Sequence, residues 1–127
     1  MHTSGLHHIA ISAGTAGVEA VARFWREVLG LEEITTFRRD DGSVRSVWLA
    51  LEPGGGAANG FLAVEAHDPA HPYGPAMIAL RISKEDRARI LEGLKARNVT
   101  VEYQSRWTMY FYDPAGNRAG LSHHPHD

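Results

Sequence analysis

The pattern of apolar and polar positions along the chain predicts two successive units of the same design. Residues 6–12 alternate in character and are rich in β-branched side chains, which predicts a strand. An amphipathic helix over about 15–29 follows, with Gly30 as its left-handed C-terminal cap. The apolar stripe of this helix consists of residues at spacings of three and four, namely Val18, Val21, Trp25 and Val28.

The remaining segments complete the first unit and then repeat its order. Further strands are predicted over 31–37, 43–51 and 61–65. The second unit is predicted to hold a helix that starts after Ser83 and strands over 76–82, 99–103, 107–112 and 118–122. The sequence therefore predicts an α+β fold, in which two βαβββ modules form paired curved mixed sheets around a central cleft, with the helices outside.

The whole chain, 1–127, is expected to be a single domain, because its length suits one hydrophobic core. The first module is expected over about 5–67 and the second over about 76–124. Between them, the segment 68–75 is rich in proline and glycine, which break both helix and strand, so it is interpreted as a linker.

Composition and charge exclude several classes of function. The net charge is −2 and no lysine or arginine stripe is present, so nucleic acid is not expected as a partner. No apolar run approaches the roughly 20 residues that span a bilayer, so no membrane partner is expected. The absence of cysteine removes disulfides and thiolate chemistry. A cytoplasmic protein is the default expectation.

Strand alternation predicts which side chains face the cleft. If Ile9 and Ile11 cover the helix, His8 points the other way, because side chains alternate along a strand. The same argument turns Leu62 and Val64 towards the helix and leaves Glu65 on the face of His8. The ligand-binding residues expected to line this face are His8, Trp48, Met77, Arg81, Met109, Phe111 and Arg118.

The chain resembles the vicinal oxygen chelate superfamily, the group of glyoxalases, bleomycin-resistance proteins and extradiol dioxygenases. The resemblance covers essentially the whole chain. It rests on the doubled βαβββ order, on the opening His8-Ile9-Ala10-Ile11, on Val28-Leu29-Gly30-Leu31 at the end of the first helix, and on the turn Asp113-Pro114-Ala115-Gly116-Asn117. These motifs identify the fold better than the chemistry, because function depends on the site.

The resemblance implies four metal-ligand positions, two in each module. In this chain they fall on His8, Glu65, Met77 and Gly120. Imidazole and carboxylate suit a divalent metal, whereas a thioether is a poor ligand for hard or borderline ions and glycine has no donor. His67 and His124 are the possible substitutes. No cofactor is expected, and a divalent metal held by His8 and Glu65 is the alternative.

Other interpretations of these residues remain open. His8 and Glu65 can pair with each other across the pocket, and Glu65 can act as a general acid or base. Trp48 can be a wall residue or can stack on a planar ligand. Arg81 and Arg118 can bind an anionic ligand or lie at a solvated edge.

The sequence thus indicates a small-molecule binding protein of the glyoxalase/bleomycin-resistance/dioxygenase type, with a mostly apolar cleft and an incomplete metal site. The alternative is a divalent-metal-dependent lyase, isomerase or dioxygenase of the same superfamily, so whether the chain is an enzyme stays open. A second alternative is a dimerising interaction module without a ligand. The resemblance implies a homodimer.

Overall fold

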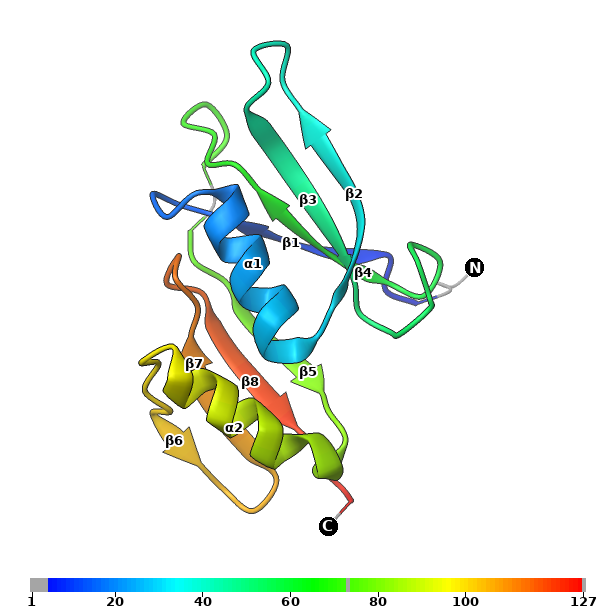
Figure 1. Cartoon of the computed structure of the whole chain (residues 1–127), viewed down its shortest axis with the longest axis vertical. Helices are drawn as coiled ribbons and strands as arrows, with labels where there is room; N and C mark the ends of the chain where they lie inside the picture. Colours follow the sequence, from blue (N-terminus) through cyan, green and yellow to red (C-terminus); the bar gives the residue numbers. More distant parts are fainter. Residues whose placement is uncertain (1–4, 73, 127) are drawn as a thin grey trace.

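Two four-stranded sheets, each covered by one helix, form the molecule (Figure 1). The computed structural model describes residues 5–72 and 74–126. The first unit contains β1 (His8–Ser12), α1 (Val18–Leu29), β2 (Glu32–Arg38), β3 (Val44–Ala50) and β4 (Phe61–Glu65). The second contains β5 (Met77–Arg81), the 3-10 turn η1 (Lys84–Asp86), α2 (Arg87–Ala96), β6 (Tyr103–Gln104), β7 (Thr108–Tyr112) and β8 (Arg118–Ser122). The predicted α+β fold with βαβββ twice is confirmed.

Both sheets have the same mixed topology. The strand orders are β1-β4-β3-β2 and β5-β8-β7-β6, and in each sheet the first and last strands of the unit are parallel neighbours. In the first sheet this parallel register sets His8 opposite Phe61 and Ser12 opposite Glu65. In the second it sets Met77 opposite Arg118.

The predicted strand over 99–103 differs most from the structure. Pairing with β7 starts only where the Glu102 N–H donates to the Tyr110 carbonyl, and the ladder itself covers Tyr103–Gln104. Val99 and Val101 instead pack, partly buried, against the core. Their apolar alternation therefore reflects burial of two side chains outside a regular strand.

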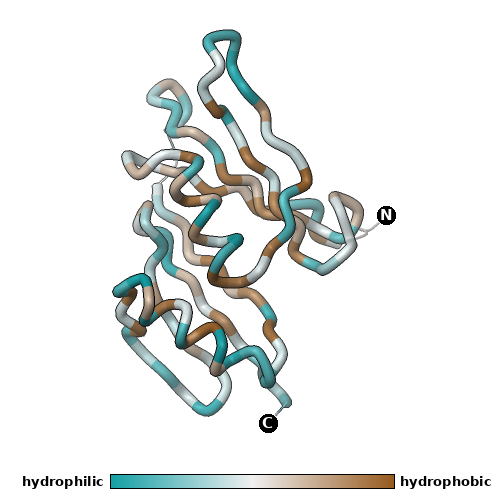
Figure 2. The backbone as a smooth tube through the Cα atoms, in the orientation of Figure 1, coloured by the Kyte–Doolittle hydropathy of each residue, from teal (hydrophilic) through white to brown (hydrophobic). Residues whose placement is uncertain are grey.

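The helix α1 joins the two sheets through one core. Its buried face packs on β3 and β4, and its aromatic rings also reach the second sheet. The rings of Phe24 and Trp25 lie 6.0 and 6.3 Å from that of Phe111 on β7. Figure 2 shows the outer positions of the helices and the tip of the β2–β3 hairpin as hydrophilic. The described residues contain no helix with the length and hydropathy to cross a membrane.

The turn between β7 and β8 ties the units together. Buried Asp113 accepts a hydrogen bond from Trp25 Nε1–H of α1 at 3.0 Å. Fully buried Asn117 donates to the carbonyl of Ser12 at 3.3 Å and accepts from the Ala76 N–H at 2.8 Å. Gly116 adopts φ +85°, a conformation that glycine permits, so the Asp-Pro-Ala-Gly-Asn motif acts as a structural clamp.

Candidate functional site

Four aromatic rings form a row across the face of the first sheet that points away from α1. We call His8, Phe61, Trp48 and Phe37 the ring row. His8 stacks on Phe61 with ring centroids 4.9 Å apart and planes 8° apart, and Phe61 stacks on Trp48 at 4.2 Å and 24°. Phe37 meets Trp48 at 5.0 Å and 62°. The row follows the strand order β1-β4-β3-β2, so every strand contributes one ring.

Exposure varies along the ring row. Phe61 is 1% exposed because it lies between two other rings, while Trp48 and Phe37 are half-buried and His8 is exposed. The His7 ring meets Phe61 edge-on at 5.5 Å, and the Nδ1 atoms of His7 and His8 are 2.9 Å apart. The prediction that His8 points away from the helix agrees with this packing. The row thus presents accessible ring surface on His8, Trp48 and Phe37, with the buried Phe61 ring packed between His8 and Trp48.

Glu65 lies at the other end of the same strand pair. It stands four residues after Phe61 on β4, roughly 13 Å along the strand from the position opposite His8. The expectation that His8 and Glu65 pair is therefore wrong: both residues are on the expected face, but the parallel register keeps them apart. The half-buried Glu65 carboxylate has no hydrogen-bond partner within the described residues, and its neighbour Ser46 buries an unpartnered hydroxyl.

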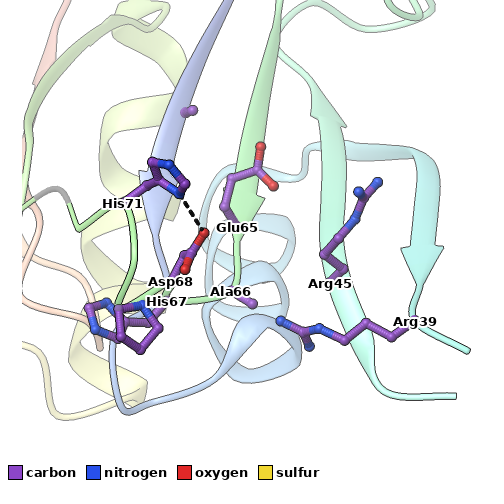
Figure 3. A pocket seen from close by; sticks show the side chains of 9 residues that line it. Arg39, Arg45, Glu65, Ala66, His67, Asp68 and His71 are labelled. Carbon is purple, nitrogen blue, oxygen red and sulfur yellow. Dashed lines mark hydrogen bonds and ion pairs between the residues drawn. The ribbon is translucent and has the colours of Figure 1, made fainter. Parts of the chain in front are cut away.

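A polar hollow of about 590 Å³ opens beside Glu65. Figure 3 shows Arg39 and Arg45 approaching from the β2–β3 hairpin, opposite the segment after β4. There Asp68 accepts from the Ala70 N–H and contacts His71 Nδ1 at 3.3 Å, and these two contacts hold the pKa of the Asp68 carboxyl below its usual value. The hollow is lined by Ala10, Arg39, Arg45, Glu65, Ala66, His67, Asp68, Pro69 and His71.

Tyr110 dominates the corresponding face of the second sheet. The guanidinium of Arg118 lies 4.4 Å from the centroid of the Tyr110 ring, and Tyr103 lies at 6.0 Å. The ring also covers Gly120: a Cβ atom there would lie 2.8 Å from Tyr110 Cε1. The exposed Met77 side chain lies beside Gly120, because a Cβ atom at position 120 would be 3.5 Å from Met77 Cε.

The expectation that Met109 and Phe111 line the cleft is wrong. Both side chains are fully buried in the core, on the helix side of β7. Nearly every residue of the segment 108–112 is apolar or aromatic, so the sequence pattern did not show which of its side chains face the core. Tyr110, and not Met109 or Phe111, lies on the face of β7 that points away from the core. The pairing of β7 with β8 sets Tyr110 opposite Gly120, and a large ring opposite a glycine was the available signal.

The two arginines expected to bind an anion are not brought together. Arg118 stands opposite Met77, whereas Arg81 stands opposite Ser122, four residues further along β8. This spacing corresponds to roughly 13 Å along the strand. Arg118 is half-buried over Tyr110 and Arg81 is exposed. The hypothesis of a joint anion site at these residues is not supported by the geometry.

The residues at the four family ligand positions do not fit a metal centre. His8 and Glu65 are too far apart along β1 and β4, Met77 offers only a thioether, and the Tyr110 ring covers Gly120. His67 lies in the polar hollow, while the ring of His124 packs edge-on against Trp107 at 5.0 Å. Across residues 5–72 and 74–126 no three histidine, aspartate or glutamate side chains are grouped to hold an ion.

Comparison with known proteins gives one family match. A family model described as Glyoxalase/Bleomycin resistance protein/Dioxygenase superfamily matches residues 5–121. No curated protein sequence matches the chain.

Solved structures share the fold at low sequence identity. FosX, a fosfomycin resistance protein of Listeria monocytogenes crystallised with Mn(II) and sulfate, is 21% identical at a TM-score of 0.69, with 94% of this chain and 92% of that chain covered. Lactoylglutathione lyase of Agrobacterium tumefaciens is 19% identical at a TM-score of 0.69, with 96% of this chain and 95% of that chain covered. The antibiotic binding protein TnmS3 of a Streptomyces species is 23% identical at a TM-score of 0.69, with 96% of this chain and 97% of that chain covered.

Proposed function

The chain belongs to the glyoxalase/bleomycin resistance protein/dioxygenase superfamily, and we propose that it is a binding protein for a planar aromatic small molecule. The ring row carries this proposal. A planar ligand contacts the accessible ring surface of His8, Trp48 and Phe37, while Phe61, stacked between His8 and Trp48, holds those two rings in place. Each stacked ring pair contributes about 0.5–1.5 kcal/mol beyond the buried apolar area.

The polar hollow receives the part of the ligand that extends past the rings. A molecule that reaches from the ring row along β4 to Glu65 spans roughly 13 Å, the size of a fused-ring compound with a polar substituent. At that end it meets the unpartnered Glu65 carboxylate and the guanidinium of Arg45. If the protein catalyses a reaction, Glu65 is the residue we assign to proton transfer, because a half-buried carboxylate beside bound ligand is suited to it.

The donor set argues against the metal-dependent alternative. FosX was crystallised with Mn(II), but the residues at the ligand positions of this chain do not fit such an ion. The description of TnmS3 as an antibiotic binding protein supports a binding role for this scaffold. Elemental analysis of tag-free protein tests the point: a stoichiometric divalent ion that is lost in His8→Ala would contradict the metal-free proposal.

Titration calorimetry with quinoline, 2-naphthoate and anthraquinone-2-sulfonate tests the ring row. We expect at least one of them to bind, and Trp48→Ala to weaken that binding about tenfold, because it removes one stacking surface and its buried area. Trp48→Phe keeps a ring and should lose less than threefold. Trp25→Phe, a change in the core behind the sheet, is the control. Binding that is equally tight in Trp48→Ala, or absent for all three compounds, overturns the proposal.

A further inference from the structure

A basic hollow lies on the second unit, away from the ring row. It has a volume of about 690 Å³ and opens between the first turns of α2, the connection from β6 to β7, and the residue after β8. These segments meet near the C-terminal end of the chain in Figure 1. None of the lining residues is acidic, and three are cationic: the hollow is lined by Lys84, Arg87, Ala88, Leu91, Ser105, Arg106 and His123.

Arg87 provides fixed positive charge at the back of this hollow. Its half-buried guanidinium donates to the carbonyls of Ser105 and Arg106 at 2.8 and 2.9 Å. It also donates to Gln104 Oε1 at 3.2 Å and to His123 Nε2 at 3.2 Å. Every one of these acceptors is neutral, so the hydrogen bonds hold the guanidinium without cancelling its charge. A partly desolvated charge of this kind favours a nearby anion.

His123 is one of the residues that hold the Arg87 guanidinium in place. Because arginine can only donate, His123 Nε2 must be the acceptor and carries no proton. The proton of the neutral ring is therefore on Nδ1, which donates to the His126 carbonyl. His123 is buried, and its backbone N–H donates to the Trp107 carbonyl. Hydrogen bonds thus hold Arg87 and His123 in place, and Lys84 and Arg106 also line the hollow.

We propose that this hollow binds a phosphate monoester with a short apolar group. A phosphate monoester carries about −1.5 to −2 charges at pH 7, which suits three cations better than the single charge of a carboxylate. Lys84, as a compact point charge, is a common phosphate ligand. Ala88 and Leu91 form the apolar part of the lining, where the organic group packs. The site does not depend on the function proposed for the ring row.

Calorimetry at low salt with n-butyl phosphate, inorganic phosphate and pentanoate tests the proposal. We expect n-butyl phosphate to bind at least tenfold more tightly than the other two. Lys84→Glu and Arg106→Gln should each weaken binding about tenfold, whereas Lys95→Glu, a charge reversal on α2 outside the hollow, should not. Thermal unfolding of each variant confirms that it is folded.

The outcomes distinguish the two sites. Trp48→Ala should leave n-butyl phosphate binding unchanged, because the probe has no ring to stack and Trp48 is not part of the basic hollow. No binding at millimolar concentration overturns the proposal, as does equal affinity of the Lys84→Glu variant. Inorganic phosphate that binds as tightly as n-butyl phosphate refutes the apolar subsite. Loss of binding in Trp48→Ala alone would assign the phosphate to the ring row instead.

Discussion

Tyr110 determines what the second sheet presents to a ligand. Its ring covers the glycine opposite it and supports the Arg118 guanidinium, so the face carries a phenol and a cation. At the scale of single residues, the sequence predicted on which face of the sheet His8 lies, because apolar and polar residues alternate clearly along β1. The sequence did not predict which side chains of β7 face the core, because its residues are nearly all apolar or aromatic. It also did not predict the distance between His8 and Glu65, which depends on the register between β1 and β4.

Gly120→Ala should destabilise the protein by about 1–2 kcal/mol, because the added methyl group would lie 2.8 Å from Tyr110 Cε1 and displace the ring. In a Tyr110→Ala background the same change should be neutral or stabilising, since alanine restricts the unfolded chain more than glycine does. Urea denaturation of the two single variants and the double variant measures this coupling. Equal costs in both backgrounds would contradict the proposed contact.

The elements differ in how clearly the sequence defines them. The strands β4 and β8 begin and end at the predicted residues, and each begins directly after a glycine-containing turn. The helices were predicted from their apolar stripes, but their mutual packing was not. A charged pair joins them: Arg97 at the end of α2 donates to Glu27 on α1. Sequence spacing along one helix contains no information about this contact between two helices.

The Glu27–Arg97 pair should make stability depend on pH in the acid range. The hydrogen bond from Arg97 holds the pKa of the Glu27 carboxyl below its usual 4.5 in the folded protein. A lowered folded pKa means that this contribution is complete above pH 4.5 and is lost as the pH falls through the folded value. Urea denaturation of wild type and Glu27→Gln should therefore differ at pH 6 and converge by pH 2.

The matching control for this pair is Glu92→Gln on α2, because the exposed Glu92 carboxylate forms no ion pair with any residue that the structure describes. In an Arg97→Ala background, the effect of Glu27→Gln on stability should depend less on pH, because only the attraction of Arg23 and Arg26 still lowers the Glu27 pKa. A difference between wild type and Glu27→Gln that grows on acidification would show that another group is responsible.

At the scale of the whole molecule, the clamp at Asp113 and Asn117 adds polar contacts between the two units to their shared core. These two buried residues connect α1, the end of β1 and the start of β5 through side-chain hydrogen bonds. From the sequence, the Asp-Pro-Ala-Gly-Asn motif predicted a turn and a family. Its role between the units required knowledge of which distant carbonyl and N–H groups it faces.

Asn117→Ala should destabilise the fold by about 2–4 kcal/mol, because it leaves the Ala76 N–H and the Ser12 carbonyl unpaired in the interior. Trp25→Phe removes the donor to Asp113 and part of a fully buried ring, and should also cost about 2–4 kcal/mol. Thermal and urea unfolding followed by circular dichroism measure both. A cost below about 0.5 kcal/mol in either variant would contradict the role of the clamp.

We further propose that a second copy of the chain covers three of the exposed apolar side chains. Met77, Tyr103 and Tyr112, all on the second unit, are 52%, 56% and 44% exposed. Sedimentation velocity should give a dimer at micromolar concentration, and Met77→Lys combined with Tyr103→Lys should shift it to monomer, because each adds a charge to the buried patch. A monomer in the unmodified protein would contradict this proposal.

The ring on β7 also constrains how this scaffold can change over time. A side chain at position 120 displaces the Tyr110 ring at a cost unless residue 110 has first become small, so a carboxylate on β8 at this position is least costly when Tyr110 is replaced first. The less costly mutational path from this chain towards metal-assisted chemistry therefore passes through an intermediate that has lost its phenol before it gains a donor.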